Sequence, residues 1–148
     1  MVISVIGAGS CDKETYAIAE AVGRLIAEKG AILVTGGLGG VMEAASKGAK
    51  YAGGITVGIL PGFRKEDANP FVDVPIITGL SHARNVLVAR SADAVIAVSG
   101  GYGTLSEIAI ALKLGKPVAG IMTWENIEGV MKADSPEEAV EKVFELIG

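Results

Sequence analysis

The sequence predicts an α/β protein of three layers, in which helices cover both faces of a mostly parallel sheet. Three observations predict this fold class. Short apolar runs alternate with amphipathic segments along the chain, as they do in βαβ units. Glycine-rich turns follow several of these runs. Half of the 148 residues are hydrophobic, which suffices for one buried core, so residues 1–148 are expected to form a single domain.

Six segments have the short, apolar character of strands in a parallel sheet. The first begins the chain without the basic flank or cleavage site of a signal peptide. Pro61 and Gly62 stop the third strand, and the polar segment Phe63–Pro70 that follows is expected to be a mobile loop. The expected strands are Val2–Ile6, Ala31–Thr35, Ile55–Leu60, Val72–Ile77, Ala94–Val98 and Val118–Ile121.

Five segments have the periodicity or end signals of helices. The first has Val22 and Ile26 on one apolar face, and Gly30 ends it. Ser81 is suited to cap the third helix, and Pro136 fits a first helical position in the last. The expected helices are Lys13–Glu28, Val41–Ala52, Ser81 to about Ser91, Thr104–Leu114 and a final helix that opens at Asp134–Glu138.

Four turns are expected to meet at one edge of the sheet. Parallel strands joined by right-handed crossovers form a Rossmann-like sheet, whose ligands bind at the carboxyl ends of the strands near the point where strand order reverses. The turns at that edge are Gly7–Asp12, Gly36–Gly40, Gly79–Arg84 and Ser99–Gly103. Because three of them are rich in glycine or other small residues, their clustering predicts a ligand site.

The turn after the fifth strand is the most informative. Ser99–Gly103 joins an apolar strand to a helix, and the backbone N–H groups of such a turn, with the positive end of the helix dipole, favour an anion such as phosphate. Glu107 follows close enough to act on a sugar attached to that phosphate. The alternative is a capping box, with Thr104 as the cap and Glu107 at the third position. The glycines favour a ligand, because a capping box does not need them.

The other turns carry weaker signals, each with a structural alternative. Gly7–Asp12 begins like a dinucleotide fingerprint, but its last residue, an aspartate, replaces the third glycine, which disfavours a standard NAD site. Gly36–Gly40 can line a ligand site or form a tight turn for helix packing. Arg84 can be a surface residue or a cation for phosphate. His82, the only histidine, is expected to be solvated at a helix start.

Composition disfavours several other functions. The net charge is −4 without a dense basic block, so nucleic acid is not expected as a partner. No apolar run approaches the roughly 20 residues that span a bilayer, so a membrane is not expected either. The single cysteine, Cys11, cannot form an internal disulfide, which fits a reducing cytoplasm. No Cys/His cluster indicates a metal site.

Residues 100–107 have the sequence Gly-Gly-Tyr-Gly-Thr-Leu-Ser-Glu, which matches a PGGxGTxxE motif from its first glycine onward, with Ser99 in place of the proline. Together with Gly36-Gly37 and Gly40-Val41-Met42, this motif resembles the LOG family, once labelled "possible lysine decarboxylase". The resemblance extends over about residues 2–121.

Members of that family with known activity hydrolyse the N-glycosidic bond of cytokinin nucleoside 5′-monophosphates, giving a free base and ribose 5-phosphate. The resemblance implies that reaction here on a purine nucleoside 5′-monophosphate, with Glu107 and Arg84 as catalytic residues and no cofactor required. A carboxylate can stabilise the oxocarbenium-like charge that develops on the ribose. The residues that the resemblance assigns to phosphate or nucleotide binding are Gly9, Ser10, Gly36, Gly37, Gly40, Met42, Gly100, Gly101, Tyr102, Gly103 and Thr104.

A related branch of the same fold resembles molybdenum cofactor carrier proteins, which bind a phosphorylated pterin. Two departures from the hydrolase pattern favour this alternative. Asn85 follows Arg84 where active members carry a lysine, and Glu43 follows Met42 where a glycine is usual. On this alternative the chain holds molybdenum cofactor or a nucleotide and does not cleave it.

Self-association is a further implication of the resemblance, since family members are dimers or larger. A homodimer or higher homo-oligomer is therefore expected. The small apolar helices at Val86–Ala89 and Ile108–Leu112 are the segments expected to supply a two-fold interface.

Overall fold

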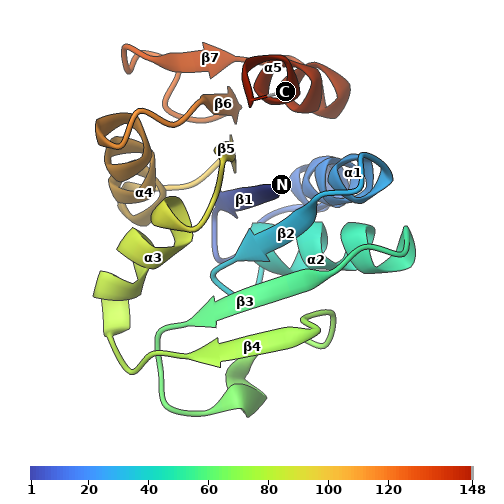
Figure 1. The fold of residues 1–148 in the computed structure, drawn as a ribbon, viewed down its shortest axis with the longest axis vertical. Helices are drawn as coiled ribbons and strands as arrows, with labels where there is room; N and C mark the ends of the chain where they lie inside the picture. Colours follow the sequence, from blue (N-terminus) through green and yellow to red (C-terminus); the bar gives the residue numbers. More distant parts are fainter. Residues whose placement is uncertain (148) are drawn as a thin grey trace.

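The computed structural model describes residues 1–147, which form one seven-stranded sheet covered by helices on both faces (Figure 1). All paired strands are parallel. The strands are β1 (Val2–Gly7), β2 (Ile32–Thr35), β3 (Thr56–Leu60), β4 (Val74–Ile77), β5 (Ala94–Val98), β6 (Val118–Ile121) and β7 (Val130–Lys132). The helices are α1 (Lys13–Glu28), α2 (Val41–Tyr51), α3 (Asn85–Arg90), α4 (Tyr102–Lys113) and α5 (Pro136–Ile147).

Alternating side chains of the sheet face two separate cores. Ile3 and Val5 of β1 are fully buried in a cluster with residues of α1, α2 and α5, whereas Ile6 packs in a second cluster with residues of α3 and α4. Figure 1 shows the same division, with α1, α2 and α5 on one side of the sheet and α3 and α4 on the other. The predicted three-layer α/β fold is therefore confirmed, and its sheet is parallel throughout.

The strand order is β4-β3-β2-β1-β5-β6-β7. From β1 the chain builds outward through β2 and β3 to β4, then returns to place β5 on the other side of β1 and builds outward again to β7. The reversal lies between β1 and β5, which pair in register from Ile3 with Ala94 to Gly7 with Val98. In such sheets the carboxyl ends of the two central strands diverge into a ligand-binding crevice.

Two predicted helix starts are wrong. Ser81 does not cap a helix: it has a φ of +53° and is the first residue of a 3₁₀ turn, Ser81–Arg84, which leads into the short α3. Thr104 does not cap α4 either, because the helix begins at Tyr102, with Gly101 as the N-cap residue. The capping-box alternative is excluded, since Thr104 and Glu107 both lie inside the helix and are buried.

Three further expectations for segments can be compared with the structure. Residues 63–70 contain a 3₁₀ turn at Lys65–Asp67, and Asn69 ties the segment to the neighbouring glycine turn through its backbone N–H, which donates to the Gly37 carbonyl at 2.9 Å. Strand β7 is absent from the predicted set. Of the nine helix residues expected at a two-fold interface, four are buried in the core: Val88, Ala89, Ile108 and Ala111.

No helix within residues 1–147 is both long enough and apolar enough to cross a membrane.

Candidate functional site

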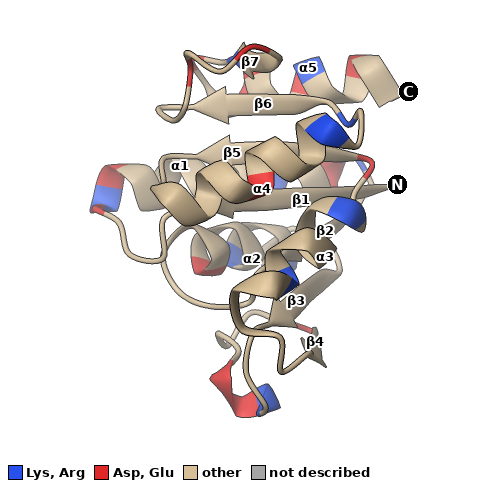
Figure 2. Ribbon diagram, turned by 90° about the vertical axis from the view of Figure 1, so that its left-hand side faces the viewer, with Lys and Arg blue, Asp and Glu red and all other residues tan. Residues whose placement is uncertain are grey.

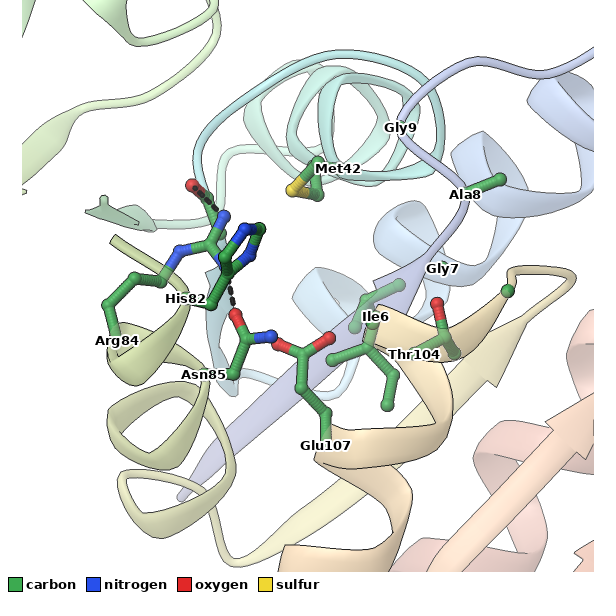
Figure 3. A pocket seen from close by; sticks show the side chains of 14 residues that line it. Ile6, Gly7, Ala8, Gly9, Met42, His82, Arg84, Asn85, Thr104 and Glu107 are labelled. Atoms are coloured by element: carbon green, nitrogen blue, oxygen red, sulfur yellow. Dashed lines mark hydrogen bonds between the residues drawn. The ribbon is translucent and has the colours of Figure 1, made fainter. Parts of the chain in front are cut away.

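A cleft of about 200 Å³ opens at the carboxyl ends of β1 and β5, where the strand order reverses (Figure 3). All four turns predicted to meet at this edge contribute to it. Its walls are formed by Val5, Ile6, Gly7, Ala8, Gly9, Gly36, Met42, His82, Arg84, Asn85, Gly101, Gly103, Thr104 and Glu107. Sequence-predicted residues outside this wall are Ser10, Gly37, Gly40, Gly100 and Tyr102.

The amino terminus of α4 opens onto this cleft. Its N-cap residue, Gly101, has no side chain to satisfy the free N–H groups of the first turn, and the residues of that turn, Tyr102–Leu105, include no acidic group. Gly101, Gly103 and Thr104 of this region line the cleft. The N–H groups at a helix start have no intrahelical partner and carry the positive end of the helix dipole. This wall is therefore suited to an anion.

Three of the cleft glycines have open space where a side chain would begin. A Cβ atom built on Gly9, Gly101 or Gly103 would have no non-neighbouring heavy atom of the described chain within 4 Å, helix backbone aside. None of the three has a positive φ. Packing does not explain glycine at these positions, whereas a bound group that approaches the backbone closely would require it.

The first two glycine turns are packed against each other by backbone contacts. The Val41 N–H donates to the Ala8 carbonyl at 2.9 Å. Gly40 has a φ of +61°, and a Cβ there would lie 2.3 Å from the Ala8 carbonyl oxygen. Gly37 also has a positive φ, and a Cβ there would lie 2.6 Å from Cδ2 of Leu60. The glycines at 37 and 40 thus shape the turn that carries Gly36 and Met42 into the cleft wall.

Arg84 places a buried positive charge in the cleft. Its side chain reaches under the second glycine turn, where Nε donates to the Ile59 carbonyl at 2.9 Å and Nη2 lies 3.5 Å from the Gly36 carbonyl. A Cβ on Gly36 would be 2.7 Å from Nη2, so glycine makes room for the guanidinium. No carboxylate of residues 1–147 forms a salt bridge with it. Burial lowers the pKa of Arg84, and the nearby Glu107 opposes that shift, but an arginine remains charged in proteins.

Glu107 faces Arg84 across the cleft from α4 (Figure 3). Only 7% of its surface is exposed. Burial raises the pKa of its carboxyl group from 4.5 to about 7, against the opposing attraction of Arg84. The side chain therefore exchanges a proton near neutral pH, as a general acid or base does.

Two of the cleft residues outside the predicted binding set, Asn85 and His82, have polar side chains. Asn85 is buried, its Oδ1 accepts a short hydrogen bond from Nη1 of Arg84, and its Nδ2 lies 3.4 Å from Oγ of Ser106 on α4. His82 is exposed, as predicted, and lies at the mouth of the cleft beside Arg84. Their closeness to Arg84 in the sequence is the signal that could have predicted their place in the cleft. A buried amide here holds the guanidinium in place without adding charge.

Glu43 does not line the cleft, although it follows Met42. Its Oε2 accepts a hydrogen bond of 2.8 Å from the hydroxyl group of Tyr16 on α1. This bond and burial raise the pKa of Tyr16 to about 12. The extra negative charge at position 43 is thereby held at the α1–α2 contact and does not line the cleft.

No group of three or more His, Cys, Asp or Glu side chains within the described residues is arranged to hold a metal ion.

Comparisons with protein families and with known sequences identify the family of this chain. The model described as "SLOG cluster4 family" matches residues 1–145. An uncharacterized protein of Archaeoglobus fulgidus is 60% identical over 95% of this chain and 92% of its own length. The cytokinin riboside 5′-monophosphate phosphoribohydrolase of Mycobacterium tuberculosis is 34% identical over 79% of this chain and 67% of its own length.

Solved structures match over almost the whole chain. The molybdenum cofactor binding protein of Rippkaea orientalis has 40% identity and a TM-score of 0.93, covering 99% of this chain and 97% of that one. The Moco carrier protein of Chlamydomonas reinhardtii has 38% identity and a TM-score of 0.88, covering 98% of this chain and 96% of that one.

Proposed function

We propose that this chain, which belongs to the LOG-like SLOG cluster4 family, binds a phosphorylated small molecule at the start of α4 and carries it without cleaving it. The ligand class that we favour is a phosphorylated pterin such as molybdenum cofactor. Here the cofactor is the cargo, and the protein's task is to hold it.

The observation that carries this proposal is the open glycine wall at the start of α4. Gly101 and Gly103 leave the first-turn N–H groups uncovered, and their missing side chains would otherwise project into free space. The guanidinium of Arg84 adds a fixed positive charge in the same cleft. A phosphate monoester fits this combination, because it carries up to two negative charges and several acceptor oxygens.

The choice of a pterin over a nucleotide rests on the extent of the similarity. The Rippkaea orientalis and Chlamydomonas reinhardtii proteins, whose names state that they bind or carry molybdenum cofactor, match this chain over nearly their entire lengths. About a third of the Mycobacterium tuberculosis hydrolase lies outside the match. The similarity therefore favours a carrier.

Hydrolysis of a nucleoside 5′-monophosphate is the second candidate, and Glu107 favours it. A carboxylate with a pKa of about 7 in the anion cleft is suited to orient the attacking water or to stabilise positive charge on the ribose. Arg84 would then bind the phosphorylated product and oppose protonation of Glu107. Fixing the phosphate at α4 would hold the sugar in position for that attack.

One experiment separates the two candidates. The protein is incubated with molybdenum cofactor released from a molybdoenzyme, and the pterin that remains bound after gel filtration is measured. In parallel, free base is measured after incubation with AMP and with N6-isopentenyl-AMP. Glu107→Gln is the matched variant, since it keeps the shape of the side chain and removes its charge.

The carrier proposal predicts about one retained pterin per chain, no base release, and retention that survives in Glu107→Gln. Base release that Glu107→Gln abolishes would instead establish the hydrolase. If no pterin is retained and no base is released, both candidates are contradicted.

A further inference from the structure

We infer that Thr123 and Trp124, in the segment between β6 and β7, are positioning residues that orient the anion-binding turn from behind. This inference rests on the proposed function, because it assigns a role to the support of the phosphate wall. Neither side chain lines the cleft. They act through the carbonyl groups of the turn.

Two side-chain hydrogen bonds fasten alternate carbonyl groups of the turn. Oγ1 of Thr123 donates to the Ser99 carbonyl at 2.7 Å, and Nε1 of Trp124 donates to the Gly101 carbonyl at 3.1 Å. The Gly101 carbonyl also accepts the first helical hydrogen bond of α4, from the Leu105 N–H at 3.0 Å. Residue 101 is therefore held from two directions at the helix start.

These bonds set the direction of two N–H groups. In a planar trans peptide the carbonyl group and the next residue's N–H point in opposite directions. Because the Ser99 and Gly101 carbonyls point toward Thr123 and Trp124, the N–H groups of Gly100 and Tyr102 point away from that segment. The anion cleft is lined by the same turn, through Gly101 and Gly103. We therefore take these two N–H groups, which point away from Thr123 and Trp124, to be the donors that the turn offers to the proposed phosphate, although their own residues stand outside the cleft wall.

The turn requires such support, because its backbone is in an unfavourable conformation. Ser99 has a φ of +55°, and Met122, beside it at the end of β6, has a φ of +52°. Residues with a Cβ rarely adopt this left-handed region, so external contacts must maintain it. The Ser99 N–H donates to the Ile121 carbonyl at 3.0 Å, which ties the two strained positions together.

The indole of Trp124 has a second contact with the helix start. Its ring stacks on that of Tyr102, with centroids 6.1 Å apart and planes inclined by 30°. A hollow of about 370 Å³, lined by Gly100, Thr123 and Trp124 among others, lies on this side of the turn. Thr123 and Trp124 therefore support the turn from a face of the molecule outside the cleft, and they can be substituted without changing a residue of the cleft wall.

The test uses two variants that remove one donor each: Thr123→Val, which keeps the side-chain shape, and Trp124→Phe, which is smaller but keeps an aromatic ring for Tyr102. Thr56→Val is the matched control, since Oγ1 of Thr56 donates to the Phe71 carbonyl at 2.6 Å at the amino end of β3, the opposite end of the strands from the cleft. The ligands are inorganic phosphate and AMP, titrated while the ¹⁵N–¹H amide spectrum is recorded, and thermal unfolding is measured for each variant.

In the unaltered protein, the amide signals of Gly100 and Tyr102 should shift with phosphate. The Thr123→Val and Trp124→Phe variants should each weaken the affinity for both ligands about three- to tenfold, the effect of one net hydrogen bond, and should reduce those two shifts. Thr56→Val should leave the affinity and the shifts unchanged. A merely structural role would lower the melting temperature without this selective loss.

The two ways of failing are distinguishable. If the unaltered protein binds phosphate at α4 but Thr123→Val and Trp124→Phe bind it equally well, the inference is wrong and the proposed function stands. If phosphate shifts no amide of the turn in the unaltered protein, the phosphate wall itself is wrong, and the inference fails with it.

Discussion

At the scale of single residues, the site is defined by two opposite charges that are buried without a salt bridge between them in residues 1–147. Arg84 is held by carbonyl groups and by Asn85, which leaves its charge available to a ligand. The carboxyl group of Glu107 is buried away from water, and its attraction to Arg84 offsets only part of the lost solvation energy. Burying these two charges without a salt bridge lowers the stability of the fold, because buried charges are normally paired. A role in ligand binding would account for that cost.

The raised pKa of Glu107 predicts a pH-dependent cost in stability. Below pH 4.5 the carboxyl group is protonated in the folded and the unfolded chain, and its burial carries no charge penalty. As the pH rises to about 7 the unfolded chain releases this proton first, so the free energy of unfolding falls; above 7 the loss is complete. It amounts to on the order of 3 kcal/mol.

Glu107→Gln should therefore unfold at a higher denaturant concentration than the unaltered protein at pH 8, with the difference shrinking toward pH 4. Chemical denaturation of both proteins across this range is the measurement. A difference that does not vary with pH would show that the carboxyl group has an ordinary pKa.

Arg84→Gln should weaken the binding of phosphorylated ligands about ten- to hundredfold, because a buried charged donor is lost. Arg90→Gln is the control, since Arg90 is an exposed arginine six residues further along the chain. Calorimetric titration with AMP or the phosphorylated pterin would measure both. Equal affinities in the two variants would remove Arg84 from the binding site.

Residue-level prediction from the sequence placed residues correctly where they lie in, or shortly after, a turn at the carboxyl ends of the strands. Gly101, Gly103, Arg84 and Glu107 were all expected at this edge, and all line the cleft. Trp124 was not anticipated, because its contact with Gly101 joins positions 23 residues apart and has no local pattern.

At the scale of elements, helix stability and the proposed ligand binding place opposite demands on the start of α4. Gly103 is an unfavourable residue within a helix, and nothing packs into the space that its side chain would occupy. Gly100, by contrast, has a φ of +104°, and a Cβ there would lie 2.1 Å from Oγ1 of Thr104. The fold explains the glycine at position 100, but it does not explain the glycine at position 103.

Gly103→Ala should therefore keep or raise the free energy of unfolding, by up to about 1 kcal/mol, and weaken phosphate binding by crowding the wall. Gly100→Ala should lower the free energy of unfolding. Denaturant titration and phosphate binding, measured on both, test the contrast. An alanine at 103 that binds phosphate as well as glycine does would show that the open space is not used.

The boundaries of elements were less predictable than their existence. The expected segments Lys13–Glu28, Ala94–Val98 and Val118–Ile121 have the predicted bounds, because their apolar pattern is continuous. Thr104 and Ser81 were misplaced as caps, since the side-chain rule for capping does not apply where a glycine is the N-cap residue or a 3₁₀ turn begins the helix. Strand β7 has only three residues, too few to show an alternation.

At the scale of the whole molecule, the sheet is covered unevenly. The connection from β3 to β4 contains a 3₁₀ turn and no α-helix, and α3 has only six residues. Figure 2 shows β4 at the edge of the sheet beyond α3. Val74 and Ile76 pair with Val57 and Ile59, which face the α3 side. Both are more than 40% exposed, and Val86 on α3 is also exposed.

This uncovered apolar region, formed by Val74, Ile76 and Val86, is where we expect the chain to self-associate. Figure 2 shows few charged residues on the ribbon of α3 and α4 beside it, which suits contact with a second copy related by two-fold symmetry. Size-exclusion chromatography with light scattering should give a dimer or larger species at micromolar concentration, and Ile76→Lys with Val86→Lys should give a monomer. A monomeric unaltered protein would contradict this expectation.

The central claim is that the start of α4 holds a phosphate group of a carried ligand, and retention of the phosphorylated pterin tests it most directly. The pterin that stays with the protein through gel filtration should be about one per chain for the unaltered sequence and much less for Gly103→Ala, although the variant is at least as stable. Absence of bound pterin in the unaltered protein, or equal retention by Gly103→Ala, would contradict the account.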